Sequence, residues 1–153
     1  MTKIDPTSAF GEYAVPRAGV WTPDILGPGF EAQALQLLPD EEGEVVATVV
    51  RHLPEEDPNR LQGTPSKPVF RALYIHGWND YFHQRELARQ IALAGGEFYG
   101  LDLRKYGRSW RKNQTFGWIR DLSQYDEDIE EAIDLLPRHL HPGAAPRRRP
   151  GED

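Results

Sequence analysis

The 153-residue sequence predicts an α/β fold in which an antiparallel hairpin is followed by a β–α–β unit and a further helix. Three observations lead to this prediction. Residues 30–53 hold two apolar segments around a short acidic turn, residues 69–103 alternate strand, helix and strand patterns, and residues 122–136 repeat apolar side chains at helical spacing. A chain of this length can form one domain with a substantial core.

The composition divides the chain into three regions. Residues 1–29 are rich in proline and glycine and predict an irregular N-terminal arm, ordered only after about Tyr13. Residues 30–136 carry the α/β pattern. Residues 137–153 (PRHLHPGAAPRRRPGED) have no periodicity and almost no large apolar side chain, so we expect an unstructured Pro/Arg/Gly-rich tail.

The first expected elements form the hairpin. Its strands are FEAQALQLL at residues 30–38 and EVVATVVRHL at residues 44–53, and the turn PDEEG joins them. Enrichment in valine and threonine favours the second strand. Residues 54–68 contain four prolines and no apolar periodicity, which predicts a surface loop.

The β–α–β unit follows. Residues 69–75 (VFRALYI) form a continuous apolar run, which is typical of a strand buried on both faces of a parallel sheet. A helix is expected over residues 83–94, with leucine, isoleucine and alanine on one side, and a glycine pair ends it. Residues 97–103 (EFYGLDL) then predict the second parallel strand.

The last expected element is a helix over residues 122–136. Apolar residues spaced three or four apart mark one face, and acidic residues crowd the other side near the N-terminal half, where they suit the helix dipole. The expected buried face consists of Leu122, Tyr125, Ile129, Ile133 and Leu136.

Charge and composition limit the partners. A net charge of −6 argues against a nucleic-acid partner, because phosphate binding requires a basic face. The absence of cysteine excludes disulfides and thiolate metal sites. No stretch has the length of a membrane span or the pattern of a secretion signal. We therefore expect a soluble, cytoplasmic protein with no stable membrane insertion.

Two motifs stand at the ends of the two predicted parallel strands. The sequence HGWND (residues 76–80) follows the first strand, and DLRKYGRS (residues 102–109) follows the second as D-x-x-x-x-G-x-S. In this order and spacing they resemble the N-terminal half of an α/β-hydrolase of the lysophospholipase, monoglyceride-lipase and serine-aminopeptidase-like group. The resemblance extends over about residues 30–136.

The resemblance implies an incomplete α/β-hydrolase sheet and a half-built site. Trp78 would donate its backbone N–H to an oxyanion hole, and His76 and Gly77 would form the turn that presents it. His76 would orient this turn and not act as a base, while Asp102 and Ser109 would shape the second loop through local hydrogen bonds. The implied substrate is a small acyl ester, with no cofactor and no metal.

The sequence departs from the family at the nucleophile. No G-x-S-x-G elbow occurs, and none of the serines (Ser8, Ser66, Ser109, Ser123) stands between a buried strand and a helix. Nucleophile, acid and base are all absent. We therefore expect the N-terminal part of a serine-type hydrolase of carboxylic esters, acylglycerols or lysophospholipids, inactive alone and produced by truncation or a frameshift. The alternative is a non-catalytic complementation module whose strand 69–75 pairs with a separate C-terminal half.

Three further interpretations are open. His76, Asp80 and His83 could form a metal cluster, although helical ligand spacing conflicts with the strand pattern. Ser109 could form a nucleophile–base dyad with His76 or His83. The basic residues within 104–117 could bind an anionic or lipid-phosphate head group, although a solvated loop is the simpler interpretation.

Overall fold

A computed structural model describes residues 15–140 of the chain. Within that span the predicted hairpin, β–α–β unit and following helix are all present close to their expected bounds. The strands are β1 (Thr22–Pro23), β2 (Phe30–Gln36), β3 (Val46–His52), β4 (Phe70–Ile75) and β5 (Gly96–Asp102), and the helices are α2 (Arg85–Leu93) and α3 (Tyr125–Leu135). Three short 3₁₀ turns complete the described elements: η1 (Pro54–Glu56), η2 (Gly107–Ser109) and η3 (Leu122–Gln124).

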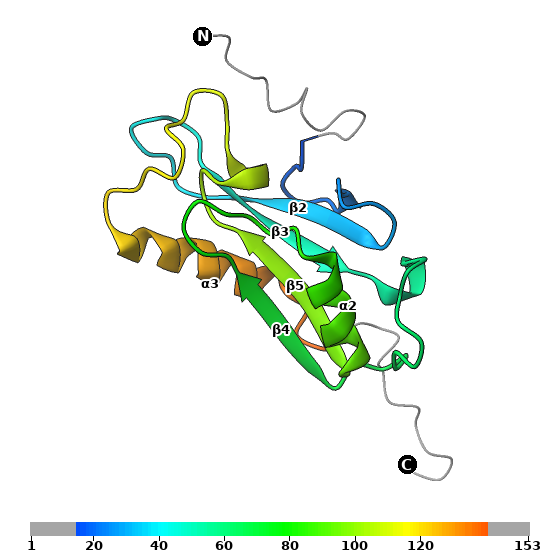
Figure 1. Cartoon of the computed structure of the whole chain (residues 1–153). Coiled ribbons are helices and arrows are strands. Elements are labelled where there is room, and N and C mark those ends of the chain that lie inside the picture. Colours follow the sequence, from blue (N-terminus) through cyan, green and yellow to red (C-terminus); the bar gives the residue numbers. More distant parts are fainter. Residues whose placement is uncertain (1–14, 141–153) are drawn as a thin grey trace.

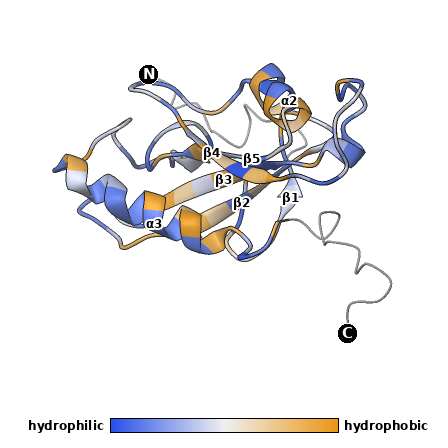
Figure 2. Cartoon of the chain, turned by 90° about the horizontal axis from the view of Figure 1, so that it is seen from below, coloured by the Kyte–Doolittle hydropathy of each residue, from blue (hydrophilic) through white to orange (hydrophobic). Residues whose placement is uncertain are grey.

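The strands form one mixed sheet in the order β1-β2-β3-β5-β4 (Figure 1). β4 and β5 are parallel, with α2 as their crossover, and all other neighbours are antiparallel. The two helices lie on opposite faces of the sheet, as Figure 2 shows edge-on. The α/β class, with an antiparallel hairpin followed by a β–α–β unit, is therefore confirmed.

The sheet separates two hydrophobic cores. Val49 on β3 points into the core under α3, and the next residue, Val50, points into the core under α2. Both side chains are fully buried, because successive residues of a strand face opposite sides and β3 is covered on both. The same period places Leu73 of β4 against the first core and Tyr74 against the second.

β4 is an edge strand, and the prediction that it is buried on both faces is wrong. Phe70 and Ile75 are each 40% exposed and Val69 is 77% exposed, whereas every residue of β5 is buried. A run of apolar residues shows that a strand has apolar faces, but burial also depends on having a neighbour on each side. β4 has that neighbour only in β5 among the described strands.

The C-terminal helix starts later than predicted and turns a different face inward. Residues 122–124 form the turn η3, capped by Asp121, so Leu122 is 75% exposed. Ile133 is also exposed, while Ala132 and Asp128 are buried against the sheet. The prediction that Leu122 and Ile133 lie on the buried face is therefore wrong, because a buried carboxylate takes part of that face.

Part of the predicted N-terminal arm adds to the sheet. β1 pairs with β2, and Ala18 bridges Ala34, so residues 15–29 lie along the edge of the hairpin. The predicted boundary of order near Tyr13 and the tail beyond residue 140 fall outside the described residues, and the three-region division stays a prediction. Between residues 15 and 140 no helix has the length and apolar composition needed to cross a bilayer.

Candidate active site

At the carboxyl ends of β4 and β5, the two connections leave the sheet toward opposite faces. β4 leads to α2 on one face of the sheet, and β5 leads through residues 103–121 to α3 on the other (Figure 2). In open α/β sheets, ligands bind in the crevice outside the carboxyl ends of two such neighbouring strands. The predicted His-Gly-Trp corner follows β4 directly and therefore lies at this crevice.

An open groove of about 400 Å³ occupies this position. Its lining is mainly apolar and aromatic, and no serine or carboxylate belongs to it. Burial and the nearby Tyr106 raise the pKa of Tyr125, which lies in the groove wall, to about 12, so this phenol is neutral near pH 7. The lining residues are His76, Gly77, Trp78, Leu103, Tyr106, Gly117, Ile119, Leu122 and Tyr125.

His76 joins the two loops that border the groove. Its Nδ1 lies 2.7 Å from the Gly77 carbonyl oxygen, and its Nε2 lies 3.0 Å from the backbone nitrogen of Leu103. A carbonyl can only accept and an N–H can only donate, so Nδ1 carries the proton and Nε2 accepts. The buried, neutral imidazole also packs against the Tyr106 ring in a T-shaped arrangement, with 5.1 Å between the ring centroids. Both nitrogens are therefore engaged, and His76 has no free nitrogen with which to act as a base.

The corner leaves the backbone after His76 accessible. Trp78 is 89% exposed, and its N–H makes no hydrogen bond within residues 15–140. Asn79 adopts a left-handed conformation at φ 56°, which asparagine tolerates better than most residues. A Cβ added at Gly77 would meet nothing within 4 Å, so this glycine keeps space open in the groove.

Asp102 and Ser109 shape the second loop through hydrogen bonds, as predicted. Asp102 Oδ1 accepts from the Phe82 N–H at 2.7 Å, and its Oδ2 accepts from the backbone of Arg108 at 3.0 Å. Ser109 Oγ donates to the Asp102 carbonyl at 2.8 Å and lies 3.0 Å from Thr48 Oγ1. These contacts tie both loops to the sheet and hold the groove walls in place.

Arg108 is a buried cation of this loop. It donates through Nη1 to Asp102 Oδ2 at 2.9 Å and to the Phe82 carbonyl at 2.7 Å, and through Nε and Nη2 to Asp24. Burial acts to lower the pKa of Arg108, but the two carboxylates outweigh it and raise the pKa above its ordinary value. The guanidinium is therefore charged and fully partnered.

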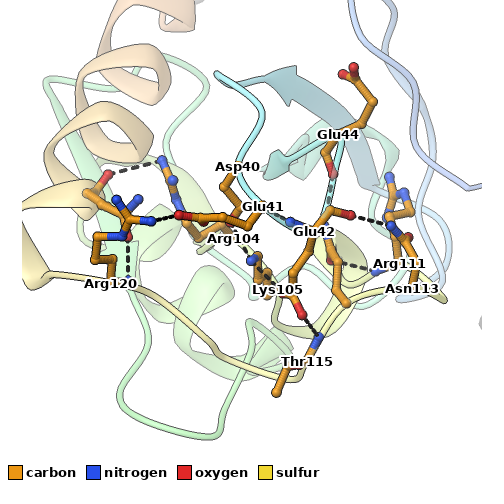
Figure 3. A network of polar contacts seen from close by, with 12 residues as sticks. Asp40, Glu41, Glu42, Glu44, Arg104, Lys105, Arg111, Asn113, Thr115 and Arg120 are labelled. Atoms are coloured by element: carbon orange, nitrogen blue, oxygen red, sulfur yellow. Dashed lines mark hydrogen bonds and ion pairs between the residues drawn. The ribbon is translucent and has the colours of Figure 1, made fainter.

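The other cations of the loop are also partnered internally, as Figure 3 shows. Lys105 is fully buried and donates to Asp40 at 2.5 Å and Glu42 at 2.6 Å on the hairpin turn. Arg104 donates to both oxygens of Asp128 on α3, each at 2.8 Å. The interpretation of residues 104–117 as a solvated loop is wrong for these three cations, and they are also unavailable to an anionic head group.

The partners of these cations could not be identified from sequence. Asp24, Asp40, Glu42 and Asp128 lie 24 to 84 residues away from their partners and carry no motif. The only sequence signal is a polar loop of unusual basicity in an otherwise acidic chain. Tyr106 was likewise missed as the ring that packs against His76.

The remaining sequence-based interpretations find little support. Ser109 is fully buried and engaged with main chain, and His76 is bound elsewhere, so no Ser109 dyad forms. Asp80 and His83 form an exposed pair at 3.5 Å, apart from the buried His76. Among the described residues no three histidines or carboxylates are grouped to hold a metal ion.

Comparison with known proteins adds one distant similarity. No family model and no curated protein matches the sequence. Among solved structures, the chain is similar to brefeldin A esterase, described as a bacterial homologue of human hormone-sensitive lipase, with 16% identity and a TM-score of 0.34. The similarity covers 84% of this chain and 40% of the esterase, so the chain spans less than half of that structure's length.

Proposed function

We propose that this chain supplies the oxyanion-donating part of a serine-type α/β-hydrolase site that acts on carboxylic esters. One observation carries the proposal: Trp78 presents an unbonded backbone N–H on a corner that His76 holds at the carboxyl end of β4. A donor held in place before reaction stabilises the negative charge that develops on an attacked carbonyl oxygen, and one such donor contributes about 3 kcal/mol.

The groove favours an apolar acyl group. Leu103, Ile119 and Leu122 line it together with aromatic rings, and no charged side chain belongs to the lining. Because apolar surface is buried favourably, the acyl chain of an acylglycerol or lysophospholipid would lie along these side chains. The ester carbonyl would then point toward Trp78.

The groove lacks the attacking group, so we propose that the chain alone has little or no esterase activity. Of the described serines, Ser109 is buried, Ser123 stands on an exposed turn and Ser66 lines a different cavity. Nucleophile, base and acid would have to come from another segment. Such an arrangement is also compatible with a complementation module, which binds its partner without chemistry of its own.

A binding experiment tests the oxyanion donor without requiring turnover. Titration of the full chain with decanoate should shift the backbone amide resonance of Trp78 more than any amide of α3. In Trp78→Pro, which lacks the N–H, decanoate binding should weaken, whereas Trp78→Phe should bind nearly as well because it keeps the donor and a ring. Binding that does not perturb the Trp78 amide would contradict the proposal.

An activity experiment tests the missing nucleophile. The purified chain should hydrolyse p-nitrophenyl esters no faster than a heat-denatured sample and should take up no fluorophosphonate probe. Labelling that disappears in Ser109→Ala would show that the chain carries its own nucleophile. The matched controls are Ser66→Ala and Ser123→Ala.

A further inference from the structure

A second cavity lies at the end of the sheet opposite the groove. β3 and β5 are antiparallel, with Arg51 paired to Tyr99, so the carboxyl end of β3 lies beside the amino end of β5. The cavity is found there, between the segment 53–68 and the last turn of α2, and its wall includes His52. The groove begins at the other end of β5, so the seven residues of that strand place the two sites about 20 Å apart.

This His52 cavity is narrow, and much of its wall is apolar. It offers about 40 Å³ of room, so only a slender molecule fits. Glu55 and Arg60 belong to the wall, but both are exposed to solvent and therefore stand at its mouth. The apolar part of the wall consists of Leu53, Pro54, Pro65, Pro68 and Ala92.

His52 contributes a buried polar atom that has no partner. Its side chain is 1% exposed, and its Nδ1 makes no hydrogen bond within residues 15–140. Its Nε2 lies 2.8 Å from Asp57 Oδ2, and the Phe30 ring stacks on the imidazole with 4.8 Å between the ring centroids. The imidazole is thus held in place, and Nδ1 remains the polar atom that it can offer to a bound molecule. A buried polar atom without a hydrogen bond is unfavourable, so a partner for Nδ1 gains free energy.

The neighbours of His52 determine that Nδ1 is an acceptor. Arg89 donates to both oxygens of Asp57, at 2.9 Å and 3.2 Å, and these bonds lower the pKa of Asp57 by more than burial raises it. The ionised carboxylate can only accept, so the imidazole proton is on Nε2. Burial lowers the pKa of His52 by more than Asp57 raises it, so the ring is neutral near pH 7. Nδ1 therefore carries a lone pair and no proton.

These properties define the chemistry of a ligand. A carboxylate or phosphate has only acceptors to offer and would leave Nδ1 unpaired. A metal ion needs several ligands, and no three histidines or carboxylates are grouped for one in the described part of the chain. A neutral hydroxyl group supplies the missing donor without bringing a charge into an apolar wall.

We propose that the His52 cavity binds a small neutral alcohol, whose O–H donates to Nδ1 of His52 and whose alkyl part lies against the apolar wall. Burial of the alkyl part adds to the free energy of the hydrogen bond. The proposal depends on this cavity and not on the Trp78 donor, so it and the proposed function can fail separately.

Nitrogen NMR of the isotope-labelled full chain tests the proposal. Near pH 8, long-range proton–nitrogen spectra distinguish the protonated from the bare nitrogen of each imidazole. Addition of n-butanol should shift Nδ1 of His52 and the backbone amide of Ala92, and should leave the Trp78 amide in place. Methyl propyl ether, an isomer without a donor, should need about fivefold higher concentration for the same occupancy, as expected from the loss of one hydrogen bond. Decanoate, which has no donor when ionised, should not shift Nδ1.

Variants separate the acceptor from the rest of the wall. His52→Gln keeps an N–H near Nε2 for Asp57 but removes the ring acceptor, so the affinity for n-butanol, followed at the Ala92 amide, should fall about fivefold. The matched control is His83→Gln, at an exposed histidine, which should bind like the natural chain. Ser66→Trp places a large ring at an exposed position of the wall, so it should block binding while leaving the urea midpoint unchanged.

Three results would overturn the proposal. A proton on Nδ1 of His52 in the alcohol-free chain would make this atom a donor. Equal responses to n-butanol and methyl propyl ether, or none to either, would mean that the cavity does not recognise a hydroxyl group and holds water only. Undiminished n-butanol affinity in both His52→Gln and Ser66→Trp would place the alcohol elsewhere.

Discussion

Arg108 donates hydrogen bonds to both carboxylate oxygens of Asp24, which precedes it by 84 residues. The bond from Nε is 2.7 Å long and the bond from Nη2 is 2.8 Å long. Both side chains are 3% exposed. The pair fastens the N-terminal arm to the loop after β5. Because the same guanidinium bonds to Asp102 and to the Phe82 carbonyl, it also connects the two loops that precede α2 and α3.

Asp24→Ala should therefore destabilise the fold by about 3–5 kcal/mol, because it leaves part of a buried charge uncompensated. Urea unfolding monitored by circular dichroism measures the change. The matched control is Glu31→Ala, which breaks an ion pair with Arg51 of similar length, 2.6 Å, whose partners are about a quarter exposed. That loss should be about 1 kcal/mol or less. Equal losses in the two variants would contradict the central role of the buried pair.

The buried pair of His52 and Asp57 should make stability depend on pH. His52 Nε2 lies 2.8 Å from Asp57 Oδ2, and Nδ1 has no hydrogen-bond partner within the described chain. Burial lowers the pKa of His52 below its ordinary 6.5, more than the Asp57 carboxylate raises it. The unfolded chain thus binds this proton more tightly, so the free energy of unfolding should hold above pH 6.5 and decline as the pH falls below it.

Urea midpoints measured from pH 8 to pH 5 test this dependence. In His52→Gln the decline should be smaller, whereas His83→Gln, at an exposed histidine, should leave it unchanged. Asp57 does not contribute in this range. Burial raises the pKa of Asp57, but hydrogen bonds, led by the one from Arg89, lower it by more than burial raises it. The stability that Asp57 contributes is therefore lost only as the pH falls below the ordinary pKa of 3.8. A slope that is identical in His52→Gln and the natural chain would exclude His52 as its source.

Replacing two glycines of the groove loops by alanine should change stability by very different amounts. At Gly107, φ is +47° and an added Cβ would lie 2.5 Å from Tyr81 Cβ and 2.7 Å from Asp102 Oδ2. Gly107→Ala should cost about 2–4 kcal/mol from strain and overpacking combined. Gly77→Ala meets open space and should change stability by less than about 0.5 kcal/mol. Thermal unfolding of the two variants side by side gives the comparison, and an equally large loss at Gly77 would show that its surroundings are tighter than described.

Ser109→Ala should affect stability and not chemistry. Its hydroxyl bonds to the Asp102 carbonyl and to Thr48, so its removal should cost about 1–3 kcal/mol by leaving buried groups unpaired. Decanoate binding at the groove should be unchanged. Ser123→Ala, on an exposed turn, is the control and should lose little in urea unfolding. Weaker decanoate binding in Ser109→Ala with full stability would instead place this hydroxyl in the site.

Local pattern was sufficient for the elements and for the corner. Valine-rich segments around PDEEG predicted the hairpin, and helical spacing predicted α3, because such periodicities arise from each element's own geometry. The HGWND motif predicted the end of β4, because the change from an apolar run to His-Gly takes place within a few consecutive residues of the sequence. The role of Trp78 as an oxyanion donor is still a prediction.

Tertiary structure decided burial and pairing. Apolar residues 69–75 and 97–103 looked alike in sequence, yet β5 is central and β4 lies at the edge, because crossover handedness and strand order are properties of the whole sheet. Likewise, the sequence alone is compatible with solvated side chains at Arg104, Lys105 and Arg108. Their burial is possible only because carboxylates from distant parts of the chain pair with them. The sequence by itself determined which segments form strands and helices and where one loop turns, since those are local preferences. Only the assembled fold decided which edge is open and which charges are enclosed, since both depend on contacts between distant residues.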